Sequence, residues 1–221
     1  MMTYRTRCAA LVALAVMAAT IPAAARQLAA RPAEEWIKML DAPARVAGLR
    51  VDEVLAKLRL KPGNVVADLG AGAGGFSLPL ARVVGPEGKV YAVEIEQGLV
   101  DYIARKAKDQ RVGNVHPVLG RFGDPALPDA DVDLAFMHDV LHHVEDRPGY
   151  LRHASKYLKP GGRFAFVELD AKTGAHRHDA TLQITLEQLN AWMADIGFAL
   201  AEEFPMFEDK WFVVYARKPR S

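Results

Sequence analysis

One segment constrains the fold more than any other, because an apolar run leads straight into glycines and then into a second apolar run. Residues 65–76 read Val-Val-Ala-Asp-Leu-Gly-Ala-Gly-Ala-Gly-Gly-Phe. Glycine has no Cβ, so the backbone can turn sharply there and approach a ligand closely. A helix that begins after such a turn presents free N–H groups to an anion. The segment therefore predicts a strand, a ligand-binding turn and a helix.

The rest of the chain repeats this alternation of strand and helix. Strands are expected at 65–69, 89–95, 115–119, 132–137 and 163–168, and helices at 76–84, 99–108 and 147–158. A capping box of Thr185 and Gln188 predicts one more helix, which ends before Gly197. The last two strands, 198–203 and 211–217, are joined too closely to be parallel. We expect an α/β fold: a Rossmann-like doubly wound sheet, mostly parallel, closed by a C-terminal antiparallel hairpin.

Two helices are expected before the sheet begins. Residues 32–40 start with a proline and carry Glu34 and Glu35 in the first turn, and Pro43 is expected to end that helix. Residues 51–60 place apolar side chains at helical spacing. We expect residues 26–60 to form a helical cap and residues 61–221 to form the α/β domain.

The N-terminus is typical of an export signal. Arg5 and Arg7 precede an apolar run, and Pro22 and three alanines, residues 23–25, follow that run. This order predicts a signal peptide over residues 1–25 and a periplasmic or secreted protein. The alternative is an uncleaved membrane anchor at the same place, which would be the protein's only contact with a membrane. Cleavage would remove Cys8, the only cysteine in the chain.

The composition narrows the possible chemistry. Lys and Arg number 28 and Asp and Glu number 27, for a formal net charge of +1, so nothing indicates a nucleic-acid partner. Without a cysteine the mature chain can hold neither a Cys-ligated zinc nor a Cys nucleophile. We expect no metal site.

The glycine pattern by itself leaves the cofactor open. Gly70, Gly72 and Gly75 fit the dinucleotide pattern, but Asp68 lies two residues before them and would repel a pyrophosphate. A ligand with an ammonium group would be attracted instead. Glu94, at the end of the second strand, lies where an acid binds the ribose hydroxyls of an adenosine. Asp68 could also cap a turn, and Glu94 could be a solvated strand end.

Five motifs in this order, VVADLGAGAGGF, VYAVEIE, GDPALPDADVDLAF, VLHHVED and LKPGGRFAFVE, resemble the class I S-adenosylmethionine-dependent methyltransferases. The resemblance is greatest to the small-molecule enzymes of ubiquinone and menaquinone biosynthesis. It implies S-adenosylmethionine as cofactor. It also implies that the methionine part of this cofactor is bound by Asp68, Gly70, Ala71 and Gly72. It also implies that Glu94 binds the ribose, and that Ile95 and Asp124 border the adenine. An Asp-Pro turn is the alternative for Asp124.

The resemblance implies an SN2 methyl transfer to a small-molecule acceptor. His138 and Asp139 follow the fourth strand, so we expect them beside the cofactor and name both as candidate catalytic residues. His142 and His143 are weaker candidates for a catalytic role. Two other functions stay open: an NAD(P)-dependent oxidoreductase, and a non-catalytic exported protein that retains the fold. Residues 171–181 follow the fifth strand and are interpreted first as a solvated polar loop; the alternative hypothesis is that they border the acceptor together with Trp36 and Met39.

Overall fold

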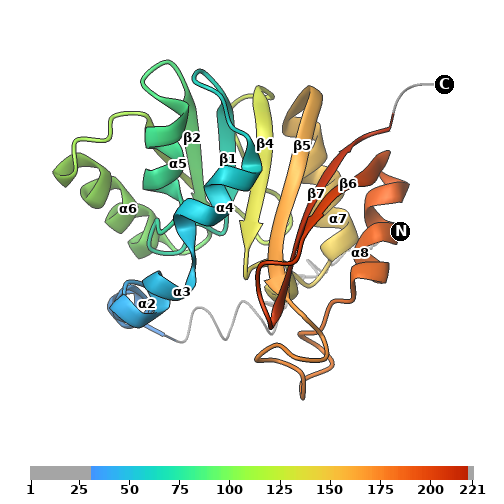
Figure 1. The fold of residues 1–221 in the computed structure, drawn as a ribbon. Helices are drawn as coiled ribbons and strands as arrows, with labels where there is room; N and C mark the ends of the chain where they lie inside the picture. The colour runs from blue at the N-terminus through green and yellow to red at the C-terminus, as the bar shows by residue number, and fades with distance from the viewer. Residues whose placement is uncertain (1–30, 219–221) are drawn as a thin grey trace, which may run out of the picture.

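The computed structural model describes residues 31–218. Their strands form one seven-stranded sheet in the order β3-β2-β1-β4-β5-β7-β6 (Figure 1). The expected leader, residues 1–25, lies outside the described residues. Strands β1 (Val65–Leu69), β2 (Lys89–Glu94), β3 (Val115–Leu119), β4 (Val132–His138) and β5 (Leu158–Leu169) are parallel. The crossover direction reverses between β1 and β4, where ligands bind in open α/β sheets.

Two antiparallel strands complete the sheet and confirm the expected hairpin. β7 (Lys210–Arg217) pairs with both β5 and β6 (Phe198–Phe204), so the last strand in sequence lies inside the sheet. Because β7 runs against β5, its first residue, Lys210, lies opposite Leu169 at the carboxyl end of β5. The predicted fold class, a mostly parallel doubly wound sheet with a C-terminal antiparallel pair, is therefore confirmed.

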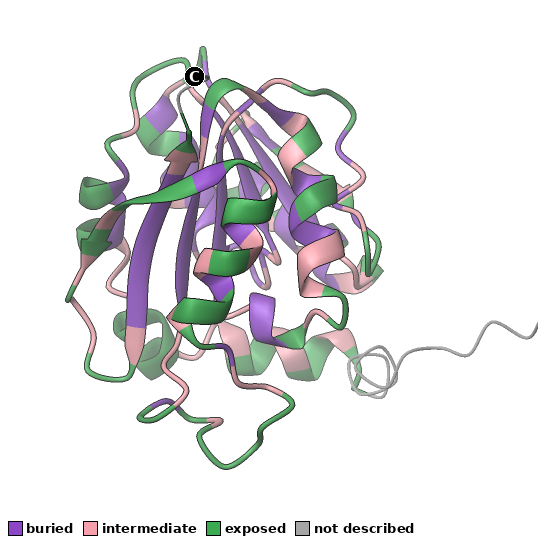
Figure 2. Cartoon of the chain, turned by 90° about the vertical axis from the view of Figure 1, so that its right-hand side faces the viewer, coloured by how far each residue is buried: buried purple, intermediate pink, exposed green. Residues whose placement is uncertain are grey.

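Helices cover both faces of the sheet, which leaves its central strands buried (Figure 2). Helices α4 (Val51–Leu58), α5 (Ser77–Val84) and α6 (Gln97–Asp109) contribute buried residues to the core on one face. Helices α7 (Arg147–Ala154) and α8 (Leu186–Asp195) contribute to the other. β1 is buried along its whole length, as its nearly unbroken apolar sequence requires.

The expected N-terminal cap divides into two parts in the structure. Helices α2 (Ala33–Leu40) and α3 (Pro43–Gly48) lie beyond the carboxyl edge of β1 and β2, at the lower left of Figure 1. α4 packs its buried face into the core instead. Pro43 follows the end of α2 and also opens α3, a helix that the sequence interpretation missed, because proline suits the first helical position.

Two predicted boundaries differ from the structure by more than two residues. The sequence predicts a turn at residues 159–162, but β5 begins at Leu158, which pairs with Val132, and the ladder resumes at Arg163 after a register shift. The helix expected to reach residue 158 ends as α7 at Ala154 and continues as a short 3₁₀ turn, η2 (Ser155–Tyr157). The capping box of Thr185 and Gln188 is confirmed, and Asp146 caps α7 by accepting from the Gly149 N–H.

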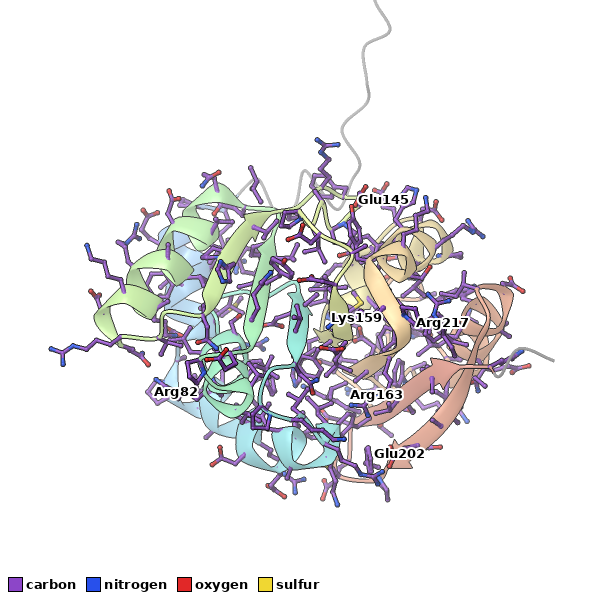
Figure 3. The ribbon with its side chains drawn as sticks, turned by 90° about the horizontal axis from the view of Figure 1, so that it is seen from above. Arg82, Glu145, Lys159, Arg163, Glu202 and Arg217 are labelled. Atoms are coloured by element: carbon purple, nitrogen blue, oxygen red, sulfur yellow. The ribbon has the colours of Figure 1, made fainter. Side chains whose placement is uncertain are left out.

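Polar contacts hold the amino edge of the sheet, away from the reversal point. Lys159 Nζ lies 3.1 Å from a carboxylate oxygen of Asp133, and Arg163 Nη2 donates to the Leu58 carbonyl at 2.8 Å. Lys159 and Arg163 are labelled in the view from above (Figure 3). Within residues 31–218 no helix is both long and apolar enough to cross a membrane.

Candidate functional site

A cavity of about 610 Å³ opens at the carboxyl edge of β1, β2 and β4. The glycine turn forms one wall, and the end of β4 forms another. α2 and α3 close the cavity on one side, and residues of the β5–α8 connection, Ala175 and His176, close it on the other. The volume suits a small ligand or cofactor, and the position at the reversal point is where the sheet topology predicts one.

The glycine turn depends on backbone conformations that favour glycine. Gly70, Gly72 and Gly74 all have positive φ angles, between 57° and 78°. The N–H groups of Gly70 and Ala71 both donate to the Val93 carbonyl at 2.9 Å, which fixes the turn to β2. A Cβ on Gly70 would collide with the side chain of Val140. The segment that follows β4 therefore packs directly on the turn.

Asp68 lies at the end of β1, and its side chain is 3% exposed at the cavity wall. Its Oδ2 accepts a hydrogen bond from the Ser77 hydroxyl at 2.5 Å. Burial raises the pKa of Asp68 to about 6, and the Ser77 hydrogen bond opposes that rise. No cationic side chain within residues 31–218 forms an ion pair with Asp68, so its charge is unbalanced inside the protein.

Glu94 and Ile95, at the end of β2, line the same cavity. Burial raises the pKa of Glu94 to about 8, and the nearby carboxylates of Asp68 and Glu96 also act to raise it. A carboxyl group that is this difficult to ionise favours a positively charged or hydroxyl-bearing ligand, which would stabilise the ionised form. Asp68 and Glu94 thus face one shared cleft, as the sequence interpretation required.

Asp124 does not line the cavity, in contrast to the expectation that it borders the adenine. Its Oδ1 accepts from the Ala126 N–H and from the Tyr157 hydroxyl, both at 2.8 Å. Burial acts to raise the pKa of Asp124, but these hydrogen bonds hold it below its ordinary value. The Asp-Pro turn, the alternative interpretation, describes this side chain better, and Arg121 and Phe122 from the same loop line the cavity instead.

His138 and Asp139, the candidate catalytic pair, both reach the cavity. Burial lowers the pKa of His138 to about 4, so its imidazole is neutral. Its Nδ1 lies 3.4 Å from Asp139 Oδ2, and its ring lies 4.9 Å from that of Phe76. The other ring nitrogen, Nε2, is fully buried and has no hydrogen-bond partner in the described structure. This geometry does not favour His138 as a proton acceptor for a ligand in the cavity.

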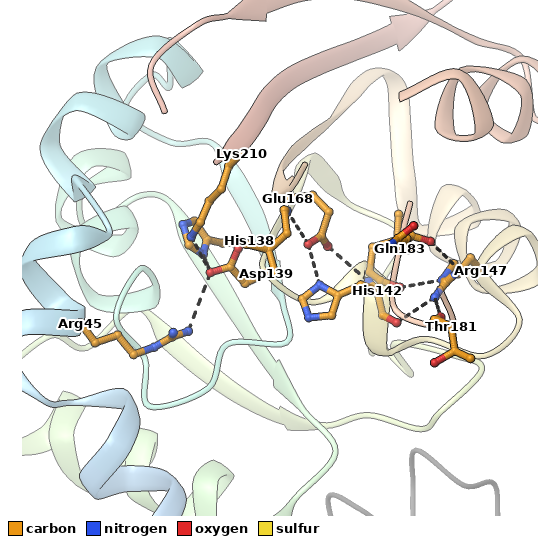
Figure 4. Close-up of polar contacts among 11 residues, drawn as sticks. Arg45, His138, Asp139, His142, Arg147, Glu168, Thr181, Gln183 and Lys210 are labelled. Carbon is orange, nitrogen blue, oxygen red and sulfur yellow. Dashed lines mark hydrogen bonds and ion pairs between the residues drawn. The ribbon is translucent and has the colours of Figure 1, made fainter. Parts of the chain in front are cut away.

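Asp139 is held by two cations that the sequence interpretation missed. Lys210 Nζ lies 2.7 Å from Asp139 Oδ2, and Arg45 Nη2 lies 4.0 Å from it (Figure 4). Burial acts to raise the pKa of Asp139, but His138, Lys210 and Arg45 hold it below its ordinary value. Asp139 also has a positive φ of 53°, a strained conformation that often marks functional sites. Only the antiparallel direction of β7 brings Lys210 here, so no local signal could have identified it.

His142 forms a short contact with Glu168, which the sequence interpretation did not single out. His142 lies in the 3₁₀ turn η1 (Leu141–His143), and its Nδ1 lies 2.6 Å from Glu168 Oε1 at the end of β5 (Figure 4). Both side chains are almost fully buried, at 3% and 2% exposure. The rings of His143 and His176 lie 4.0 Å and 5.0 Å from that of His142. The position of Glu168 at a strand's carboxyl end was the available signal.

Arg147 joins this turn to the β5–α8 connection. It donates to the carbonyls of His142 at 2.9 Å, Thr181 at 2.6 Å and Gln183 at 3.4 Å (Figure 4). Burial lowers the pKa of Arg147. Its fork of donors therefore fixes two cavity walls relative to each other.

The cap is fastened to the glycine turn by an ion pair. Asp41, after α2, accepts from Lys106 Nζ at 2.8 Å and from the Tyr102 hydroxyl at 2.5 Å. Lys106 also donates to the carbonyl of Ala73 in the turn, at 3.0 Å. Trp36 and Met39, on α2, reach the cavity as hypothesised. Lys106 therefore links the end of α2 to the glycine turn.

Within residues 31–218, no group of three or more His, Cys, Asp or Glu side chains is arranged to hold a metal ion. His142, His143 and His176 instead contact one another, and His142 contacts Glu168.

Comparison with known proteins decides the family. The methyltransferase domain family matches residues 60–208, which contain the glycine turn, both strand-end acids and η1. The chain belongs to this family. It is a class I S-adenosylmethionine-dependent methyltransferase, and the nicotinamide-dependent alternative is set aside.

The relatives of this methyltransferase have the same core. The ubiquinone/menaquinone biosynthesis C-methyltransferase UbiE of Vibrio campbellii is 34% identical over 109 residues, which are 49% of this chain and 42% of that protein. The match thus spans less than half of that relative. A crystal structure of a SAM-dependent methyltransferase from Aquifex aeolicus has a TM-score of 0.76 at 24% identity, covering 85% of this chain and all of that one. Magnesium protoporphyrin IX methyltransferase from Synechocystis, solved with bound SAM, has a TM-score of 0.59 at 20% identity over 88% and 90% of the chains.

Proposed function

We propose that this methyltransferase transfers the methyl group of S-adenosylmethionine to a small-molecule acceptor, with Asp68 and Glu94 as the residues that bind the cofactor. The observation that carries this assignment is the pair of carboxyl groups facing one cavity without a cationic partner in the described chain. Asp68 attracts the ammonium group of the methionine end, and Glu94 accepts from the ribose hydroxyls. Gly70, Ala71 and Gly72 allow close approach to the methionine end, and Ile95 packs on the adenine.

When bound, the cofactor supplies an electrophilic methyl group on a sulfonium. The protein's task is then to align the acceptor with that methyl and to exclude water. His138 and Asp139 border the methyl position, where Lys210 and Arg45 hold Asp139 in place. Asp124 supports the loop on the adenine side through its contacts to Ala126 and Tyr157.

The acceptor binds beyond the methyl group, among Trp36, Met39, His143 and His176. These side chains are aromatic or apolar, which suits a small flat molecule. The name of the Vibrio campbellii relative refers to ubiquinone and menaquinone biosynthesis, and this supports an aromatic acceptor for the present chain as well. The near-neutral charge balance supports a small molecule over a nucleic acid.

Calorimetric titration of the full chain with S-adenosylmethionine, S-adenosylhomocysteine and NAD tests the cofactor assignment. We expect binding of the first two and none of NAD. Glu94→Gln should weaken the binding of S-adenosylmethionine and of S-adenosylhomocysteine by about tenfold, because the neutral amide loses a charge-assisted hydrogen bond. The exposed control Glu87→Gln, in the turn before β2, should leave binding unchanged. Binding of NAD alone, or of none of the three, would refute the proposal.

We also propose that residues 1–25 direct the chain out of the cytoplasm, as a cleaved signal peptide or as an uncleaved anchor. Cell fractionation together with the mass of the mature N-terminus separates the outcomes. A mature chain that begins at Arg26 is expected for cleavage, and a full-length chain in the membrane fraction indicates the anchor. A full-length chain in the cytoplasm would contradict both.

A further inference from the structure

We propose that His142, oriented by Glu168, is the general base that removes the proton from an aromatic hydroxyl acceptor; this rests on the methyl-transfer function proposed above. The two side chains come from different elements, η1 and β5, and meet at 2.6 Å. Among the four described cavity-lining histidines, His138, His142, His143 and His176, only His142 forms a hydrogen bond to a carboxylate through a ring nitrogen; His138 Nδ1 lies 3.4 Å from Asp139 Oδ2 without forming one.

The hydrogen bonds of Glu168 determine which nitrogen of His142 is protonated. Glu168 Oε1 accepts from the Leu169 N–H at 2.8 Å, and Oε2 accepts from the His142 backbone N–H at 3.3 Å. Because both carboxyl oxygens of Glu168 accept hydrogen bonds from N–H groups, we infer that the Nδ1 of His142 is a further N–H donor to this side chain. The Nε2 of His142 then carries the lone pair of a base.

That Nε2 is available to a ligand. It has no hydrogen-bond partner in the described structure and, unlike the Nε2 of His138, it is not fully buried. Its ring lines the cavity, and the Nε2 side points away from Glu168 (Figure 4). The Nε2 atom of His138 is therefore enclosed, whereas the Nε2 atom of His142 can be reached from the cavity.

The surroundings of His142 keep the base in place and suit a flat acceptor. The rings of His143 and His176 pack against it, and Arg147 holds its carbonyl. Burial and the neighbouring His142 lower the pKa of His143 to about 4, so His143 is neutral. The carboxylates of Glu168 from β5 and Asp139 after β4 act on His143, and Arg147 from α7 donates to the His142 carbonyl. Planar rings on two sides favour an aromatic acceptor.

The proposed step conserves atoms and charge. Nε2 of His142 takes the hydroxyl proton while the acceptor oxygen forms a bond to the methyl carbon. The carbon–sulfur bond breaks, and its electron pair stays on sulfur. The imidazolium that results is stabilised by Glu168 and loses its proton to solvent after the methyl ether leaves. Glu168 touches no reactant in this step, so it is a positioning residue.

Two phenols of different acidity test the proposal in the full-length protein. 4-Nitrophenol is largely ionised at pH 8 and needs no base. Phenol is largely protonated at that pH and does need one. Methylation of each is followed as S-adenosylhomocysteine release. We expect His142→Asn to slow transfer to phenol by roughly 100-fold and transfer to 4-nitrophenol far less. Glu168→Gln should act in the same direction, and Glu168→Asp should restore part of the rate. His116→Asn, on exposed β3, is the control that should change neither rate.

A second readout needs no variant and no acceptor. Nitrogen NMR of the histidine rings should show His142 with the proton on Nδ1 and the lone pair on Nε2. The opposite tautomer would overturn the proposal. Loss of the base should also change the pH profile: in His142→Asn the rate with phenol should rise with pH up to the pKa of phenol, whereas the wild-type rate should depend less steeply on pH.

These outcomes are distinguishable from failure of the proposed function. Absence of S-adenosylmethionine binding to the wild-type protein refutes the methyl-transfer function itself. Binding without methylation of either phenol, or equal slowing of both phenols by His142→Asn, overturns the base assignment and leaves the methyl-transfer function intact. Calorimetry on each variant checks that the cofactor still binds, which separates loss of the base from loss of the fold.

Discussion

Asp68 and Glu94 face one cavity because of the register of two neighbouring strands. In the parallel ladder Asp68 pairs with Ala92, so Glu94, two residues further along β2, projects from the same face of the sheet. A shift of one residue in this register would turn Glu94 to the opposite face. The two carboxylates repel each other when both are ionised, and a cation bound between them would relieve this repulsion.

Replacement of Asp68 by asparagine should separate function from stability. The amide keeps an oxygen for the Ser77 hydroxyl but removes a buried charge, and the raised pKa of Asp68, about 6, corresponds to about 3 kcal/mol. We expect Asp68→Asn to raise the Tm of the unliganded protein at pH 7.5 and to weaken S-adenosylmethionine binding more than tenfold. Differential scanning calorimetry and titration calorimetry measure the two effects.

Asp133→Asn is the matched control for that substitution. Asp133 lies at the amino edge, where it accepts from the Val65 N–H at 2.7 Å and pairs with Lys159. Its loss should lower the Tm by the equivalent of about 1 kcal/mol of stability and leave cofactor binding unchanged. If Asp68→Asn destabilises the free protein as Asp133→Asn does, Asp68 is a structural residue.

Between pH 6.5 and 8, the stability of the unliganded protein and its affinity for S-adenosylmethionine should change in opposite directions as the pH rises. A carboxyl group with a raised pKa in the folded state stabilises the protein below its unfolded pKa, and this stability is lost as the pH rises through the folded value. For Glu94 that range extends from 4.5 to about 8. His138 and His143, whose pKa values burial lowers to about 4, add an opposite slope only below pH 6.5.

The unliganded Tm should therefore fall as the pH rises from 6.5 to 8, while affinity for S-adenosylmethionine increases as Glu94 ionises. Thermal melts with and without the cofactor across this range measure both slopes. Glu94→Gln should flatten both of them. A wild-type affinity independent of pH would mean that Glu94 does not contact the cofactor.

A methyl group at position 70 should disrupt the glycine turn. Gly70 has a φ of +78°, and a Cβ there would collide with Val140. We expect Gly70→Ala to lose about 3 kcal/mol in the free energy of unfolding and to abolish cofactor binding. Urea titration measures the first and calorimetry the second.

Gly113→Ala provides the comparison for that variant. Gly113 lies in the turn before β3 without a positive φ, and a Cβ added there would meet no atom within 4 Å. Its replacement should change stability by less than about 0.5 kcal/mol. Equal effects of the two substitutions would show that the turn geometry at Gly70 is not special.

Loss of the Asp41 carboxylate should loosen the cap. Asp41→Asn removes the charge that Lys106 contacts at 2.8 Å, in a partly buried pair. We expect a loss of about 1 kcal/mol and faster hydrogen exchange over residues 33–49, with a smaller loss of cofactor affinity through Ala73. Asp101→Asn, an exposed partner of Gln97 on α6, should leave exchange in the cap unchanged. Unchanged exchange in Asp41→Asn would mean that packing alone holds the cap.

The sequence predicted features that depend on neighbouring residues. The bounds of β1 and β3 were predicted correctly because short apolar runs between turn residues specify strands locally. The glycine turn and the Thr185 capping box were equally local. α3 was missed because Pro43 both follows one helix and opens the next. A proline is compatible with the end of a helix and with the start of another, so the residue alone does not tell the two apart.

Sequence by itself determined the strand–turn–helix order and the candidate acids, because backbone preferences act over a few residues. Only the tertiary structure decided which side chains meet. The β1–β2 register brought Glu94 beside Asp68, the antiparallel β7 brought Lys210 to Asp139, and the end of β5 brought Glu168 to His142. Such contacts depend on strand order and pairing across the whole sheet, and no local pattern encodes them.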